Sequence, residues 1–215
     1  MKYRCSDTTL VIEGDFLAAS TGIHGDIGQV SALFNHTVPR TWHDDHPERL
    51  LAEIAVKEGL AAPYFGMLTA VPMGALVICR SGFLTVFITA GISNHTINII
   101  GVSSEGLSRS GLLECLITAA SAKTRALLEN GRAIQGTPTD AVIMACEGPR
   151  LHRYAGTVTP AGSRLAACVR EGVPLALSRY EEGATLPLVI ELHNQEKTDT
   201  ANYAMIPKQN LPEDQ

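Results

Sequence analysis

The chain has 215 residues, enough for one large domain or two small ones, and 45% of them are apolar while 18% are charged, which is typical of a globular protein. Basic side chains number 17 and acidic ones 22, so the formal net charge is −5, and no cluster of Lys or Arg is present to neutralise a row of phosphates. We therefore expect no nucleic-acid partner. We also expect no membrane partner, because no apolar run reaches the ~20 residues of a membrane span.

Short apolar segments bounded by Gly, Pro, Ser or Asn predict strands, and apolar residues repeating every three or four positions predict helices. In chain order, the predicted elements are strand 9–12, helix 47–58, strands 65–70, 75–79, 83–89 and 97–102, helix 111–130, strand 141–146, a helix from Pro160 to about 171, and strand 186–192. This pattern predicts an α/β or α+β fold, with one domain over residues 1–194 whose mostly buried mixed sheet carries helices packed on it. The polar segment 195–215 is expected to be a loosely ordered tail.

Five cysteines are scattered along the chain, without the closely spaced pairs of a zinc site or the density of a disulfide-stapled domain. They stand at positions 5, 79, 115, 146 and 168. The first residues also lack the apolar stretch of a signal peptide, so we expect free thiols and a cytoplasmic protein. The segment 43–46 is rich in His and Asp, but the cap and first turn of the following helix explain it more simply, and no metal site is predicted.

The predicted helix 111–130 carries a lysine on its apolar face. Leu116, Ala119, Ala120 and Leu127 all lie within about 60° of Lys123 around the helix axis. The ammonium group of Lys123 either reaches water past the rim of the helix or lies in a partly buried cleft and pairs with a carboxylate.

A carboxylate is available in the polar segment Gly-Thr-Pro-Thr-Asp at 136–140, which leads directly into the apolar strand 141–146. Two threonines, a glycine and an acid before a buried strand are more than a simple turn requires. The alternative is that Asp140 only caps the turn through the local backbone.

Two further segments have the character of ligand-binding loops. The predicted strand 83–89 is followed by a stretch of small and polar residues that includes Gly91, Ser93, Asn94 and His95. Ligands of α/β sheets tend to bind at strand ends. The segment 22–28 spaces three glycines at intervals of three, which lets backbone N–H groups approach a large ligand, although it matches no nucleotide-binding fingerprint.

Three motifs, in their order along the chain, resemble the adenosylcobinamide amidohydrolase family of corrinoid salvage. They are Thr-Ala-Gly-Ile-Ser-Asn at 89–94, Ser-Ala-Lys-Thr at 121–124 and Gly-Thr-Pro-Thr-Asp at 136–140. Flanking segments, including 22–28 and Asn-His-Thr-Val-Pro at 35–39, extend the likeness over roughly residues 8–177. The resemblance implies hydrolysis of the amide that joins the aminopropanol arm to the corrin ring, with the corrinoid as substrate and no certain resident cofactor.

Amide hydrolysis requires a nucleophilic water, a base and hydrogen-bond donors for the tetrahedral oxyanion. On the hypothesis of this activity, Asp140 is the base or orients the base, and Lys123 stabilises the oxyanion or tunes Asp140. His95 is the competing base, since an unperturbed imidazole titrates near neutral pH. The substrate-binding residues are expected among Gly25, Asn35, His36, Gly91, Ser93, Asn94, Thr137 and Thr139.

A protein with such a cleft could instead bind or modify a corrinoid, or another bulky cofactor intermediate, without hydrolysing an amide. Cys5 would then be the residue that forms a thioester or ligates cobalt. An adaptor is disfavoured, because it has no use for Lys123 on an apolar stripe. In both remaining cases the partner is a small molecule, and assembly into a homo-oligomer stays open.

Overall fold

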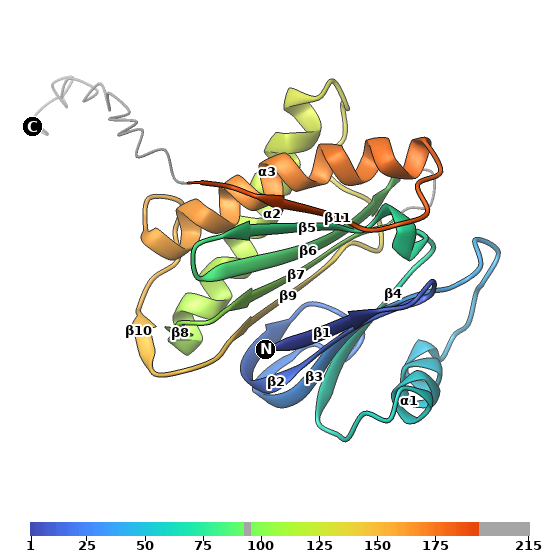
Figure 1. Cartoon of the computed structure of the whole chain (residues 1–215), viewed down its shortest axis with the longest axis horizontal. Helices are drawn as coiled ribbons and strands as arrows, with labels where there is room; N and C mark the ends of the chain where they lie inside the picture. Colours follow the sequence, from blue (N-terminus) through green and yellow to red (C-terminus); the bar gives the residue numbers. More distant parts are fainter. Residues whose placement is uncertain (93–95, 194–215) are drawn as a thin grey trace, which may run out of the picture.

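The computed structural model describes residues 1–92 and 96–193, and within them a mixed sheet of nine strands runs through the molecule (Figure 1). Its strand order is β11-β5-β6-β7-β9-β2-β3-β4, and β1 pairs with β2. The strands are β1 (Lys2–Cys5), β2 (Thr9–Ser20), β3 (Asp26–Thr37), β4 (Tyr64–Thr69), β5 (Val77–Ser81), β6 (Leu84–Gly91), β7 (Thr96–Ser103), β9 (Ala141–Cys146) and β11 (Leu188–Glu191). Three pairs are parallel, β3 with β4, β7 with β9 and β5 with β11, so the sheet is mixed as predicted.

Three described α-helices pack on this sheet. They are α1 (Pro47–Lys57), α2 (Arg109–Glu129) and α3 (Pro160–Glu181), and the remaining elements are a 3₁₀ turn η1 (Met73–Ala75) and the short parallel strands β8 (Gly106–Leu107) and β10 (Arg150–His152). The prediction of one α/β domain with helices on a buried sheet is confirmed. None of the described helices is both long and apolar enough to cross a membrane. The expected tail at 195–215 lies outside the described residues.

The sheet folds over on itself, so that β1 to β4 lie across from β5 to β7 (Figure 1). Buried side chains from both halves form one core cluster, among them Phe16 and Leu33 from one half and Phe87 from the other. The ring of Tyr3 in β1 lies edge-on to Phe87 at 5.2 Å between ring centroids. The apolar interior between the two halves therefore holds them together.

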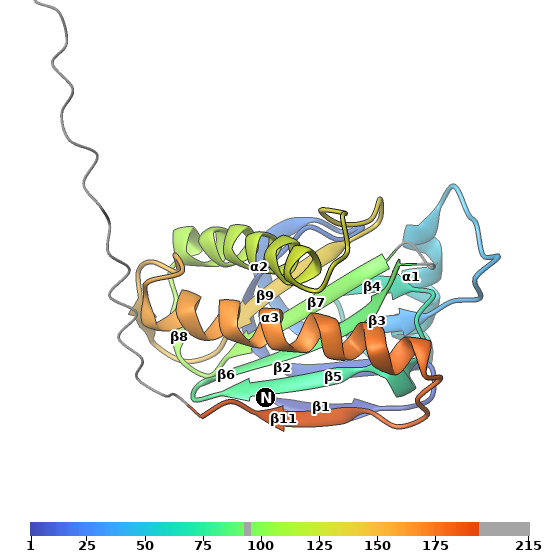
Figure 2. The same cartoon turned by 90° about the horizontal axis from the view of Figure 1, so that it is seen from above.

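Helices cover both outer faces of the folded sheet. Helices α2 and α3 lie side by side over the part formed by β5, β6, β7 and β9, as the view from above shows (Figure 2). Alternation along each strand explains the layering, because Ile99 faces this helical layer while its neighbour Ile100 faces the interior of the fold. Helix α1 covers the opposite outer face through Leu51 and Ile54, which pack on Phe34 of β3.

Several element boundaries differ from the prediction. Strand β2 continues to Ser20, because a register shift between Glu13 and Phe16 carries the pairing with β3 through a polar stretch that looked like a strand end. Strand β3 was not predicted, and its first residues are the second half of the glycine-rich segment 22–28. Strand β1 was also missed.

Helix α3 extends ten residues past the predicted end near 171, to Glu181, although it contains Gly172 and Pro174. A Cβ atom at Gly172 would collide with Ile88 of β6, so this glycine permits close packing of the helix on the sheet and does not end the helix. Tertiary packing here outweighs local helix propensity.

Candidate functional site

A cavity of about 640 Å³ opens where the end of β4 and the beginnings of β7 and β9 meet the segment that joins β3 to α1. Its described lining comes from five places along the chain: Thr21, Gly22 and Ile23; Val38, Pro39, Arg40, Trp42, His43, Asp44 and Pro47; Met67, Leu68, Thr69 and Ala70; Thr96; and Pro138, Thr139, Asp140 and Ala141. The volume lies in the range of ~300–1,000 Å³ of small-molecule sites. The cavity thus joins the predicted motif at 136–140 to loops that are distant in sequence.

An ion pair links Asp140 in the wall of this cavity to Lys123, which is not itself among the described lining residues. Lys123 reaches from α2, and its Nζ donates a hydrogen bond to Oδ2 of Asp140, which itself lines the cavity. The side chains are only 11% and 10% exposed, so the pair is largely shielded from water. The structure thus brings together the two residues that the sequence singled out. Of the two alternatives predicted for Lys123, the structure shows the pairing with a carboxylate.

Both carboxylate oxygens of Asp140 accept two hydrogen bonds each. Oδ1 accepts from the backbone N–H of Ile97 at 2.8 Å and from the hydroxyl of Thr137, while Oδ2 accepts from the backbone N–H of Thr137 at 2.9 Å and from Lys123. The strand β7, the turn 136–140 and the helix α2 are thereby joined at one carboxylate. Since its acceptor sites are occupied, this carboxylate is rigidly oriented, and taking a proton from water would disrupt at least one of these bonds.

Gly136 closes over the ion pair. A Cβ atom at this position would lie 2.6 Å from both Oδ2 of Asp140 and Nζ of Lys123. Only a residue without a side chain can pass this close, so the turn depends on glycine here.

Threonine hydroxyl groups contribute to the polar part of the lining. The hydroxyls of Thr96 and Thr139 lie 3.0 Å apart, and that of Thr21 accepts a hydrogen bond from the backbone N–H of Val142 at 3.0 Å. Hydroxyl groups can both donate and accept, so this part of the wall suits a ligand that carries amide groups.

Asn35 lies outside this lining, in a buried hydrogen-bonded chain between the two halves of the sheet. Its amide nitrogen donates to Thr89 at 3.0 Å, its oxygen accepts from Asn98 at 3.0 Å, and Asn98 also donates to the carbonyl of Leu68 at 2.9 Å. Leu68 lines the cavity, so Asn35 is linked to the cavity lining through Asn98.

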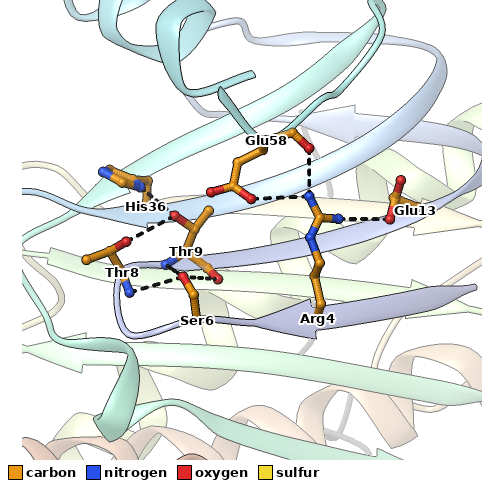
Figure 3. A network of polar contacts seen from close by, with 7 residues as sticks. All are labelled: Arg4, Ser6, Thr8, Thr9, Glu13, His36 and Glu58. Atoms are coloured by element: carbon orange, nitrogen blue, oxygen red, sulfur yellow. Dashed lines mark hydrogen bonds and ion pairs between the residues drawn. The ribbon is translucent and has the colours of Figure 1, made fainter. Parts of the chain in front are cut away.

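His36 and Cys5 also lie away from the cavity lining. Nδ1 of His36 lies 2.7 Å from the hydroxyl of Thr9, within a network that also holds Arg4 against Glu13 and Glu58 (Figure 3). Burial, and then the positive charge of Lys57, lower the pKa of His36. Burial also raises the pKa of the Cys5 thiol, with a smaller contribution from Asp7, which disfavours the reactive thiolate.

The remaining predicted binding residues divide into three groups. Thr139 lines the cavity, whereas Thr137 acts behind it by holding Asp140. Gly25 belongs to the turn between β2 and β3, whose neighbours Gly22 and Ile23 line the cavity in its place, and Gly91 pairs with Thr96 at the end of β6. Ser93, Asn94 and His95 lie outside the described residues.

The sequence-based prediction missed Trp42, Thr21 and Thr96 as lining residues. A signal existed for Trp42, since it is the only tryptophan of the chain and stands between two prolines in a polar segment. Thr96 directly follows a predicted motif. Thr21 offered no signal, because its place in the wall depends on the folding of the β2–β3 turn back toward β4.

Within the described part of the chain, no group of three or more His, Cys, Asp or Glu side chains is arranged to hold a metal ion. His43 and Asp44 line the cavity, but the His43 side chain is 91% exposed, and its Nε2 lies 3.9 Å from a carboxylate oxygen of Asp45. That the site works without a metal ion stays a prediction, which is tested by measuring activity in the presence of a chelator.

Comparison with known proteins matches almost the whole described chain to one family. A family model described as adenosylcobinamide amidohydrolase matches residues 5–96 and 95–185. A protein of that name from Methanosarcina mazei is 42% identical over 195 residues, which cover 82% of this chain and 98% of the relative. Another from Halobacterium salinarum is 30% identical over 184 residues, covering 74% of this chain and 78% of the relative. The chain therefore belongs to the adenosylcobinamide amidohydrolase family.

Proposed function

We infer that this enzyme hydrolyses the amide that joins the aminopropanol arm to the corrin ring of adenosylcobinamide. The products are adenosylcobyric acid and 1-amino-2-propanol, so a salvaged corrinoid can re-enter cobamide synthesis. In a chain of this family, the observation that carries the inference is the shielded ion pair between Lys123 and Asp140, of which Asp140 lines a cavity of small-molecule size.

We propose that Lys123 supplies the positive charge that the reaction needs. Attack of water on the amide carbon places negative charge on the carbonyl oxygen, and a fixed cation in a shielded site stabilises that charge far better than water does. The ion pair with Asp140 keeps the ammonium in one position before the substrate arrives. No large reorganisation is then needed at the moment of reaction.

The contacts of Asp140 favour the orienting role among the two that the sequence offered. Its four hydrogen bonds hold the carboxylate in place, whereas a base must leave one acceptor site open to water. We therefore propose that Asp140 positions Lys123 and the turn 136–140, and that His95 is the base that activates water. Asn94 and Thr139 are proposed to position the amide.

The alternative function, corrinoid binding or modification through Cys5, has less support. Cys5 does not line the cavity, its thiol donates a hydrogen bond to the carbonyl of Ser6 at 3.4 Å, and its raised pKa disfavours the thiolate. Replacing Cys5 by Ser should leave turnover unchanged.

The function is tested by incubating the purified protein with adenosylcobinamide, with and without a chelator, and following both products by mass spectrometry. We expect release of both products by the wild type, no turnover by Lys123→Met, and a loss of about 100-fold or more for Asp140→Asn. Matched controls are Lys57→Met and Asp15→Asn, which change the same charges at residues outside the cavity lining. Tight binding of the corrinoid by the wild type without release of aminopropanol would contradict the proposal.

We also propose that the protein acts in the cytoplasm on a free corrinoid. All five cysteines lie in the described residues as free thiols, and four of them are buried, which suits a reducing compartment. Homo-oligomer formation stays a prediction, and light scattering after size-exclusion chromatography tests it.

A further inference from the structure

Apolar side chains make up part of the cavity lining beside the threonine hydroxyls and Asp140, and the largest of these apolar side chains is Trp42. Resting on the proposed function, we propose that Trp42 packs against the flat face of the corrin ring and thereby determines how the arm enters the cavity. Trp42 would then be a binding and specificity residue of the known reaction.

The position of Trp42 is fixed by the segment that carries it. The backbone N–H of Val38 donates to the carbonyl of Thr69 at 2.8 Å, which attaches this segment to the end of β4. A turn follows, closed by a hydrogen bond from the backbone N–H of Trp42 to the carbonyl of Pro39 at 2.8 Å. Pro39 and Pro47, which also line the cavity, restrict the backbone on either side.

The ring of Trp42 is not used to build the core. Among the described residues, the three clusters of packed apolar side chains do not include it, and it forms none of the ring contacts found in the molecule. Its side chain is nevertheless partly buried at the cavity, while its neighbours Thr41 and His43 are exposed. A large aromatic ring in this position is available for a ligand.

The size of the cavity places the ring of the substrate beside Trp42. A volume of about 640 Å³ suits a drug-sized ligand, whereas a corrinoid with its adenosyl group is much larger. We infer that the aminopropanol arm enters toward Thr139 and Asp140 and that the macrocycle stays at the mouth. An aromatic side chain contributes a large, flat apolar surface there, and the indole has few rotatable bonds to immobilise.

Trp42 also provides the measurement, because it is the only tryptophan of the chain. Corrinoids absorb in the near ultraviolet where tryptophan emits, so a corrinoid stacked on Trp42 should quench most of the intrinsic fluorescence in a saturable titration. The matched control is Trp42→Phe combined with Tyr154→Trp, which moves the tryptophan to an exposed position outside the cavity lining. In this control a bound corrinoid quenches the relocated tryptophan only by energy transfer over distance, so the quenching at saturation is expected to be smaller than in the wild type.

Steady-state kinetics give the second readout. Trp42→Ala should raise KM by about 10- to 100-fold and change kcat much less, and Trp42→Phe should retain most of the affinity. Tyr154→Ala should behave as the wild type. Should Trp42→Ala fail to fold, the wild-type titration and Trp42→Phe still decide the outcome.

The results separate this inference from the proposed function. Turnover with no more quenching than in the control and an unchanged KM for Trp42→Ala would overturn the role of Trp42 and leave the hydrolase intact. Saturable quenching that exceeds the quenching of the control, without turnover, would support the role of Trp42 and contradict the hydrolase.

Discussion

Lys123 and Asp140 are each other's main compensation for burial, since both side chains are almost fully shielded and their charges meet directly. Removing one partner leaves the other charge buried without its counter-ion, which costs ~3–5 kcal/mol of unfolding free energy in comparable cases. We expect Lys123→Met to lose a large part of that amount in urea unfolding. The double variant Lys123→Met with Asp140→Asn should recover part of the stability but none of the activity. Recovery of activity in the double variant would show that the pair is only structural.

Gly136 gives a finer test of the geometry of this pair. In Gly136→Ala the new methyl group must displace either the carboxylate of Asp140 or the ammonium of Lys123, and a shift of about 1 Å at a catalytic group costs on the order of 100-fold in rate. We expect kcat to fall by at least about 10-fold in a folded protein. Gly156→Ala is the control, since a Cβ there meets nothing within 4 Å. An unchanged kcat in Gly136→Ala would contradict the positioning role.

His36 predicts a pH dependence of stability that is separate from catalysis. Its pKa in the folded protein lies below the ordinary value of 6.5, because burial and the nearby Lys57 disfavour the imidazolium and Glu58 compensates only in part. As the pH falls, His36 therefore takes up a proton in the unfolded chain before it does so in the folded protein. Its contribution to the free energy of unfolding is present above about pH 6.5 and is lost on acidification through the folded pKa. Urea unfolding between about pH 7.5 and 5 should show a smaller loss of stability for His36→Asn than for the wild type. Equal losses would contradict this account.

At the scale of single residues, the sequence predicted the two central groups and missed part of their surroundings. Helix periodicity alone placed Lys123 on a buried face, and the polar motif before a buried strand placed Asp140. Their contact required only that α2 and β9 pack together. Trp42 could not be placed in this way, because its position depends on a hydrogen bond between Val38 and Thr69, for which no periodic pattern exists.

The element that carries Lys123 begins at a well-defined cap. The hydroxyl of Ser108 accepts from the backbone N–H of Gly111 at 2.9 Å and donates to the carbonyl of Arg153 at 2.8 Å. Ser108→Ala should lower the free energy of unfolding by ~1–2 kcal/mol, because the buried N–H of Gly111 and the partly buried carbonyl of Arg153 each lose a partner. Ser163→Ala, at an exposed position in α3, should cost much less. Denaturant unfolding of both variants checks this, and equal effects would contradict the importance of the cap.

Predicted elements were accurate where one local signal dominated. Helices α1 and α2 and the strands β4, β5, β6, β7, β9 and β11 agree with the prediction to within a few residues, since their apolar patterns and end signals are local. Long-range pairing decided the others. Strand β3 is held by its register with β2 and β4, and α3 passes through Gly172 and Pro174 because of its packing against β6.

At the scale of the whole molecule, the folding of one sheet upon itself creates the site. It brings the end of β4 beside the beginnings of β7 and β9, and it allows Asn35 of β3 to form hydrogen bonds with Thr89 and Asn98 of the other half of the sheet. Composition and periodicity predicted a mixed sheet with helices on it, but a fold of this kind depends on contacts between distant strands that no local pattern specifies.

The central claim, hydrolysis of the corrinoid amide at this cavity, is tested most directly by following the reaction in heavy-oxygen water. We predict that the wild type releases aminopropanol and produces adenosylcobyric acid with one heavy oxygen atom in its new carboxylate, and that Lys123→Met produces neither above background. Recovery of intact adenosylcobinamide from the wild type, or release of products by Lys123→Met at the wild-type rate, would contradict the account.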